Sequence, residues 1–115
     1  MSQITTHVLN TSTGKPANEL AIRLEQKTAT GWQALAQGDT NSDGRIATLL
    51  ADDHVLTAGD YRMTFDIKSY FDRQQESYFY PYVEIVFSIA ESELSDHFHI
   101  PLLLSPYGYS TYRGS

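Results

Sequence analysis

Cysteine is absent from this chain of 115 residues, and basic residues are scarce. Without cysteine the protein has no disulfide framework, no thiolate nucleophile and no thiolate-ligated metal. Eight Lys and Arg residues stand against 14 Asp and Glu residues, which gives a formal net charge of −6. Nucleic-acid binding needs a basic face that neutralises phosphates, so the composition argues against a nucleic-acid partner.

Long apolar runs are also missing. No stretch approaches the roughly 20 apolar residues that span a bilayer, so we expect no membrane partner. Residues 1–7 carry neither the basic region nor the apolar core of a secretory signal. We therefore expect a cytoplasmic protein that forms one domain over residues 1–115, a size at which a single core can be buried.

Turn-forming residues divide the chain into short segments in which apolar and polar residues alternate. Turn signals occur at 10–16, 39–44, 52–60 and 105–108. Residues 61–67, which lie between two of these turns, show the period of two that is typical of a half-buried strand. Seven or eight strands at such spacing predict an all-β protein, an antiparallel β-sandwich.

The period of two is lost at residues 69–76. Ser69 is a suitable N-cap residue, and Asp72 follows it three positions later. We predict one short helix there. Pro81 then opens a strand over residues 82–90, since the first position of a strand tolerates a missing N–H.

Histidines occupy strand faces that should point away from the core. In residues 97–104 the even positions are apolar, so His97 and His99 share the opposite face, about 7 Å apart. His7 has the same relation to its apolar neighbours in the first strand. Leucines share these outward faces, and an apolar outer face on a small sandwich favours burial by another subunit. His54, in an Asp-rich loop, fits a solvated surface group.

Three kinds of site fit these residues. His97, His99 and a third histidine could form a zinc centre with an open water position, as in a metal-assisted hydrolase or hydratase. Residues 39–44 match the first half of a calcium-binding EF-hand loop. Leu50 replaces its final Glu, however, so we interpret the segment as a hairpin turn that leads Arg45 into a strand. The third kind needs no metal, because histidines act as general base and acid while an arginine and a hydroxyl hold the substrate.

Five segments of the chain carry a family resemblance. They are HVLNTSTGKPA (7–17), TNSDGR (40–45), FYPY (79–82), HFHIPLLLSP (97–106) and YGYSTYRGS (107–115). Together they resemble the 5-hydroxyisourate hydrolases, the transthyretin-like enzymes of urate breakdown, over nearly the whole chain. The terminal Tyr112-Arg113-Gly114-Ser115 is the signature that separates these enzymes from transthyretin, the thyroid-hormone carrier. One departure is Asn10, where the family commonly has Asp.

The resemblance implies a fold, an assembly and a reaction. The fold is a transthyretin-like sandwich of seven to eight strands with one short helix. The assembly is a homotetramer around a central channel, with its ligand sites at the dimer–dimer interface. The substrate is the small molecule 5-hydroxyisourate, whose six-membered ring is opened by water to 2-oxo-4-hydroxy-4-carboxy-5-ureidoimidazoline in purine catabolism.

The resemblance also implies catalytic positions at His7, Arg45, His99 and Ser115. The two histidines would handle the water and the proton, and which of them is the base stays open. His7 and Arg45 would bind the substrate as well, and Arg45 would lower the pKa of a neighbouring imidazole. Since arginine and histidine supply charge and base, we expect no metal and no other cofactor.

The terminal signature contributes two of the implied site residues. Ser115 would orient the histidine network through its hydroxyl or a terminal carboxylate, and Tyr112 would contact the substrate. Gly114 would let the backbone turn so that Ser115, which has the opposite strand parity to Tyr112, reaches the same pocket. His97 is a secondary candidate for substrate contact at the rim of the site.

Two other classes of function compete with the hydrolase. A non-catalytic carrier of the transthyretin type would use the same channel. Arg45, His99 and Tyr112 argue against it, because they would make the channel polar and narrow, whereas a carrier of a long aromatic ligand favours small apolar walls. A purely structural β-sandwich module would not require the histidines.

Overall fold

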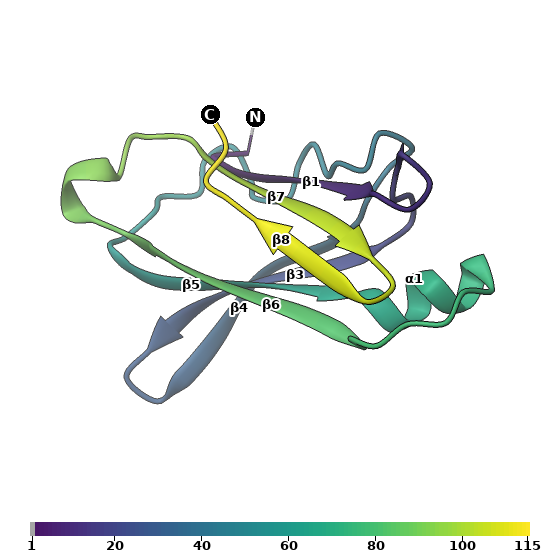
Figure 1. Cartoon of the computed structure of the whole chain (residues 1–115). Coiled ribbons are helices and arrows are strands. Elements are labelled where there is room, and N and C mark those ends of the chain that lie inside the picture. Colours follow the sequence, from purple (N-terminus) through teal and green to yellow (C-terminus); the bar gives the residue numbers. More distant parts are fainter. Residues whose placement is uncertain (1) are drawn as a thin grey trace.

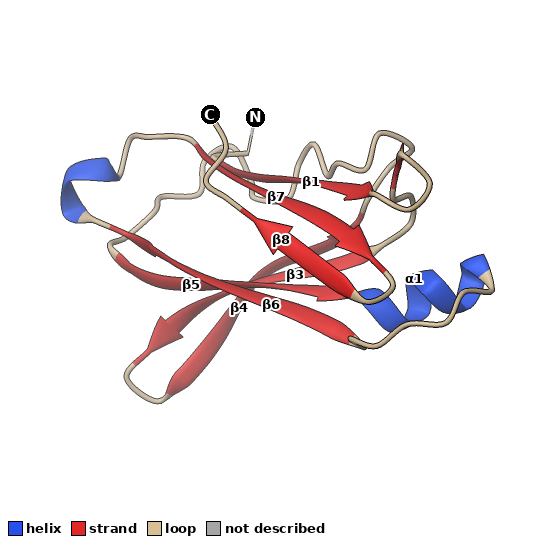
Figure 2. Ribbon diagram, in the orientation of Figure 1, coloured by secondary structure: helices blue, strands red, loops and turns tan. Residues whose placement is uncertain are grey.

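Eight strands in two stacked sheets form the framework of the structure, a computed structural model that describes residues 2–115 (Figure 1). The strands are β1 (Ile4–Asn10), β2 (Lys15–Pro16), β3 (Ala21–Thr28), β4 (Gly31–Asp39), β5 (Gly59–Asp66), β6 (Tyr82–Ile89), β7 (Phe98–Ser105) and β8 (Gly108–Thr111). The first sheet has the order β2-β1-β7-β8, and the second has the order β4-β3-β5-β6. The predicted all-β sandwich is confirmed. Its helical parts are α1 (Ile67–Gln74) and the 3-10 turn η1 (Glu91–Glu93), drawn blue in Figure 2.

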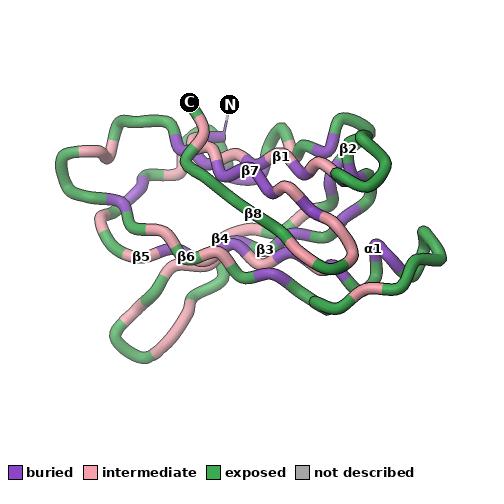
Figure 3. Tube along the Cα trace, in the orientation of Figure 1, coloured by how far each residue is buried: buried purple, intermediate pink, exposed green. Residues whose placement is uncertain are grey.

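Alternating burial along the strands places the core between the two sheets (Figure 3). In β1, Ile4 and Val8 are fully buried, while His7 on the opposite face is half-buried. In β7, Phe98 is buried and His99 is half-buried, as the parity of the sequence predicts. The faces that carry the histidines therefore lie on the outside of the first sheet.

One strand pair departs from the predicted antiparallel arrangement. β1 and β7 run parallel, whereas the other paired strands are antiparallel. Parallel neighbours need a long connection, and here the whole second sheet lies between them in the chain. The register of this pair sets Thr5 beside His99 and His7 beside Pro101. Groups from the two ends of the chain are thereby brought together.

The helix begins three residues earlier than the predicted N-cap implies. Asp66, not Ser69, is the N-cap, and its carboxylate accepts hydrogen bonds from the Ser69 main-chain N–H (3.2 Å) and hydroxyl (2.8 Å). Ile67 was expected in the strand because it continues the alternation of β5, yet it is the first helical residue. Over the described residues 2–115, no helix is long and apolar enough to cross a membrane.

The turn after β4 docks on β1 and does not lead into a strand. The side-chain oxygen of Asn41 accepts from the main-chain N–H groups of Asp43 (2.9 Å) and Arg45 (3.1 Å), which closes the turn. Gly44 has a φ of +75°, and a Cβ there would lie 2.5 Å from the Val8 carbonyl oxygen. The predicted strand at Arg45 is therefore wrong. Arg45 instead makes an isolated antiparallel bridge with His7.

Candidate functional site

A groove of about 510 Å³ lies on the outer face of the first sheet. Its walls include Thr5 of β1, Arg45 and the rest of the turn that follows β4, and both histidines near the start of β7. Ser115 closes one side of it. Three of the predicted site residues, Arg45, His99 and Ser115, are thus brought together in one hollow.

Two isolated β-bridges frame this groove. On one side of the β1–β7 pair, Arg45 bridges to His7 of β1. On the other side, Gly114 bridges to His99 of β7, with its N–H donating to the His99 carbonyl at 2.8 Å. Main-chain contacts therefore hold the arginine and the terminal segment against the two histidine-bearing strands.

Thr5 links the two histidines of the β7 region. Its hydroxyl lies 2.8 Å from His99 Nδ1 and 3.0 Å from His97 Nε2, and the two imidazoles stack with centroids 6.4 Å apart. A hydroxyl has one proton to donate, so when it donates to one ring it accepts from the other. The hydrogen-bonding roles of the two rings are linked in this way. The sequence offered one signal for Thr5, its place two residues before His7 on the same face.

Gly114 is needed for close approach to His99. A Cβ at this position would lie 2.5 Å from His99 Cδ2, closer than a real Cβ can come. The residues of positive φ include Gly14 and Gly44 but not Gly114, so the predicted turning role is corrected. The missing side chain instead lets the terminal segment lie directly on the imidazole and carry Ser115 into the groove.

Tyr112 lies apart from the groove within one chain. It is 60% exposed and borders a separate apolar cleft of about 240 Å³, whose walls include Phe87 of β6 and one side of His99. His7 does not line the groove either, but it adjoins the groove through its bridge to Arg45. Substrate contact by Tyr112 and His7 stays a prediction.

Burial and the charge of Arg45 favour the neutral form of both site histidines. Burial contributes most to the lowered pKa of His7 and of His99, and the Arg45 guanidinium comes second for each. His97 and His7 lower the pKa of His99 further, because three imidazoles and one guanidinium share this region. Asp43 opposes the shift at His7 through a main-chain hydrogen bond and its negative charge. Neutral imidazoles are able to accept a proton at neutral pH.

These shifts predict a pH dependence. In an NMR titration the ring protons of His7 and His99 should change at a pH below 6.5, the ordinary value of histidine, and Arg45→Gln should move both midpoints upward. The unfolded chain takes up protons near pH 6.5 and the folded chain takes them up at lower pH. The free energy of unfolding should therefore be level above pH 6.5 and decrease below it, until the folded pKa values are passed. Titration of both rings at or above pH 6.5 would contradict the assignment.

The zinc alternative lacks a ligand set within one chain. Among residues 2–115, no three His, Cys, Asp or Glu side chains gather closely enough to hold a metal ion. His97 and His99 both lie within hydrogen-bond distance of the Thr5 hydroxyl. In the EF-hand-like segment, the side-chain oxygen of Asn41 accepts a hydrogen bond from the Asp43 main-chain N–H within the turn. The groove thus offers histidine, arginine and hydroxyl groups.

The chain is a β-sandwich with a groove on the outer face of one sheet, lined by histidine, arginine and hydroxyl groups. The chain belongs to the HIUase/transthyretin family, whose model matches residues 4–114. That match spans both sheets and the Gly114 bridge.

Two relatives that match the chain over most of its length are named for the same activity. A 5-hydroxyisourate hydrolase from Salmonella typhimurium is 44% identical over 112 residues, which cover 97% of this chain and 80% of the relative. A 5-hydroxyisourate hydrolase from Mus musculus is 44% identical over 116 residues, which cover 99% of this chain and 96% of the relative.

Solved structures of both branches of the family share the fold. The Klebsiella pneumoniae 5-hydroxyisourate hydrolase matches with a TM-score of 0.83 and 38% identity, covering 97% of this chain and 98% of that one. Sea bream transthyretin in complex with thyroxine matches with a TM-score of 0.89 and 35% identity, covering 98% and 95%. The backbone alone therefore does not separate hydrolase from carrier, and the side chains of the site must do so.

Proposed function

We propose that this protein hydrolyses 5-hydroxyisourate to 2-oxo-4-hydroxy-4-carboxy-5-ureidoimidazoline in urate degradation. The observation that carries the proposal is the groove that Arg45, His99 and Ser115 line together. In this groove the charge of Arg45 lowers the pKa of His99 and so favours its neutral imidazole. Curated relatives at 44% identity are hydrolases of this substrate. A ring with several carbonyl oxygens fits a guanidinium, which donates two parallel hydrogen bonds from a planar group.

The groove residues divide the hydrolysis into binding and proton transfer. Arg45 holds the substrate oxygens and stabilises the negative charge that develops when water attacks a ring carbonyl. A neutral imidazole of the His7–His99 pair removes a proton from that water, and the protonated pair returns it to the departing ring nitrogen. Ser115 and the Thr5 hydroxyl orient the rings for these transfers. No step in this scheme needs a metal or another cofactor.

A carrier function fits the site less well. Thyroxine, bound by the sea bream relative, is a long aromatic ligand. The groove of this chain instead presents an arginine, two histidines and a serine to its ligand. On contact with apolar rings, these polar groups would lose their hydrogen bonds to water and gain no hydrogen-bond partner in return. This cost disfavours a carrier function.

We also propose that the protein is a homotetramer whose sites lie at the dimer–dimer interface, and that it acts in the cytoplasm. The groove lies on an outer sheet face, and the edge strands β6 and β8 carry exposed apolar side chains such as Val86 and Tyr109. Apolar edges and faces of this kind favour association. Light scattering should give a mass near four times the 13.0 kDa of the chain. A fully active monomer would contradict the assembly.

The function is tested by a direct assay. Urate oxidase generates 5-hydroxyisourate from urate, and the loss of its ultraviolet absorbance is followed with and without the protein at micromolar concentration. We expect the protein to accelerate the loss, while heat-denatured protein does not. An unchanged decay together with tight thyroxine binding would favour the carrier.

The terminal residues are expected to matter for turnover and little for stability. Deletion of Gly114 and Ser115, or extension of the chain beyond Ser115, should lower kcat about 10²-fold with a nearly unchanged melting temperature, because two residues bury little area but fix the histidine geometry. Ser115→Ala separates the contribution of the hydroxyl from that of the main chain. A decrease in kcat as large as that of the deletion would implicate the hydroxyl. Normal turnover by both the extended and the truncated protein would remove Ser115 from the site.

Gly114→Ala is expected to lower kcat by about 10²-fold, because its methyl group would force His99 or the terminal segment out of place. The structural reason is the distance of 2.5 Å from the added Cβ to His99 Cδ2. Gly108→Ala is the matched control at the start of β8, since its Cβ would meet Ser105 Oγ at an ordinary 3.8 Å. Equal activity of the two variants in steady-state assays would show that the close approach is unimportant.

A further inference from the structure

The side chain of Arg113 does not line the groove and makes contacts with two other residues. Its Nη1 donates to Glu93 Oε2 at 3.0 Å, and its guanidinium carbon lies 5.0 Å from the centroid of the Phe98 ring. Phe98 and Glu93 flank the stretch that leads from η1 into β7. The contact therefore joins the terminal segment to the chain directly before His99.

We propose that Arg113 is a positioning residue for catalysis: clamped between Glu93 and Phe98, it fixes the terminal segment so that Gly114 lies against His99 and Ser115 enters the groove. This inference rests on the proposed hydrolase function.

The position of Arg113 in the chain explains why such a clamp is needed. β8 ends at Thr111, and Tyr112 and Arg113 belong to no strand. Next along the chain, the Gly114 N–H donates to the His99 carbonyl. Gly114 has no side chain with which to hold itself, and its lack of a Cβ is what allows the contact with the imidazole. The arginine before it supplies a side-chain anchor in addition to this main-chain hydrogen bond.

The partners of Arg113 are themselves fixed in place. Glu93 uses its other carboxylate oxygen to accept from the Ala90 N–H at 3.1 Å, so the carboxylate is oriented before the arginine binds. The same Ala90 hydrogen bond, and then Arg113, lower the pKa of Glu93, which keeps the carboxylate charged. Phe98 is buried in the core and presents a rigid ring. An exposed ion pair contributes little by itself, but a guanidinium that also packs on a fixed aromatic ring gains a second, directional contact.

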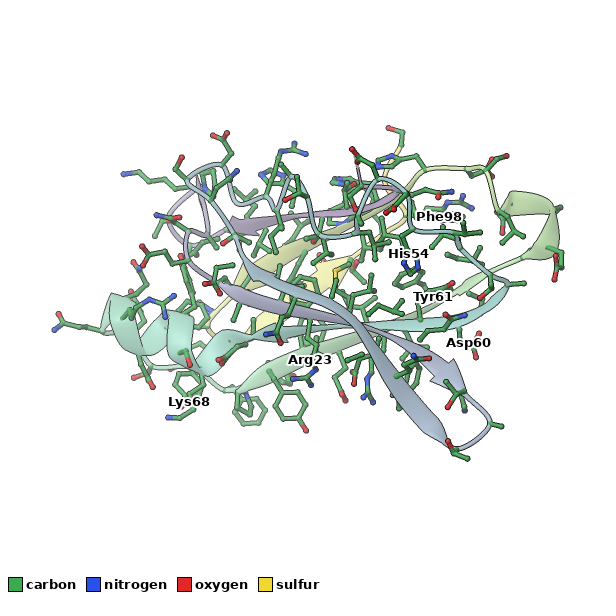
Figure 4. The ribbon with its side chains drawn as sticks, turned by 180° about the vertical axis from the view of Figure 1, so that it is seen from behind. Arg23, His54, Asp60, Tyr61, Lys68 and Phe98 are labelled. Atoms are coloured by element: carbon green, nitrogen blue, oxygen red, sulfur yellow. The ribbon has the colours of Figure 1, made fainter. Side chains whose placement is uncertain are left out.

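A double-mutant cycle with two readouts tests the clamp. Arg113→Ala removes both contacts, whereas Glu93→Gln keeps an oxygen for the Ala90 N–H and removes the charge. Lys68→Ala is the matched control, since it breaks an exposed ion pair of 3.2 Å to Asp72. Lys68 and Phe98 lie at opposite ends of the sandwich (Figure 4). The readouts are hydrogen exchange of the Gly114 amide and the separate values of kcat and KM.

We expect Arg113→Ala to speed Gly114 exchange and to lower kcat about 10-fold with KM changed less than about twofold, because Arg45 still binds the substrate. Glu93→Gln should do the same to a smaller extent, and the double variant should be no worse than Arg113→Ala alone. Lys68→Ala should change neither readout.

Several results would overturn the proposal. An unchanged kcat in Arg113→Ala would do so whether or not Gly114 exchange rises, and so would additive losses in the double variant. Absence of hydrolysis by the unaltered protein would overturn the proposed function instead. The exchange measurement would then still decide whether Arg113 holds the terminal segment.

Discussion

His99→Asn and His7→Asn are each expected to lower kcat by about 10²- to 10⁴-fold, the usual contribution of a positioned proton-transfer group. Asparagine keeps a polar side chain of similar size but does not accept a proton at neutral pH. Thr5 still has a hydrogen-bond partner in His99→Asn, so the fold should persist. Steady-state kinetics of the purified variants, with circular dichroism to check folding, measure the effect.

His54→Asn is the matched control for both histidine variants. His54 lies in the loop between β4 and β5 and does not line the groove. Its replacement should leave kcat within about twofold, because surface substitutions away from special features have small effects. Similar losses in all three variants would mean that histidine replacement acts through folding, and the assignment of His7 and His99 would fall.

Arg45→Ala should reduce kcat/KM by about 10²- to 10³-fold, since the loss of one donor to a developing oxyanion has an effect of this size. Arg45→Lys should recover little of it. A lysine ammonium is a point charge with freely rotating donors, whereas the guanidinium is a planar fork that grips two oxygens. The bridge to His7 uses the main chain of residue 45 and should survive both substitutions.

Arg23→Ala provides the arginine control for this experiment. Arg23 lies on β3 in the second sheet and does not line the groove. Its loss should leave kcat/KM nearly unchanged. Near-normal activity of Arg45→Lys would show that charge alone suffices, and the bidentate role of Arg45 would be wrong.

Much of the sequence prediction came from strand parity, the alternation of successive side chains between the two faces of a strand. A period of two depends on local backbone geometry, so the outward placement of His7 and His99 followed from their apolar neighbours alone. The helix was also found from local signals, but its start was misplaced. Ile67 fits both the end of a strand and the first turn of a helix, and the choice is made by the Asp66 cap.

The local alternation of apolar and polar residues could not predict contacts between distant segments of the chain. Nothing local reveals that β1 and β7 pair in parallel, and so the double contact of Thr5 with two imidazoles was missed. The role of Gly114 was misassigned for the same reason, because the atom that excludes a side chain there belongs to His99. Arg45 was placed in a strand because the turn before it suggests a hairpin, whereas the turn packs on β1.

The parallel β1–β7 pair also sets the order in which the protein can become functional as it folds. Thr5 and His99 are separated by 94 positions in the sequence, so their contact requires the chain to close a loop of nearly its whole length. The second sheet, by contrast, pairs β3 with β4 and β5 with β6, which are close in sequence. Distant pairings form slowly relative to local ones. We therefore expect a refolding chain to form its local strand pairs before the histidines meet, so that catalytic competence is acquired late in folding.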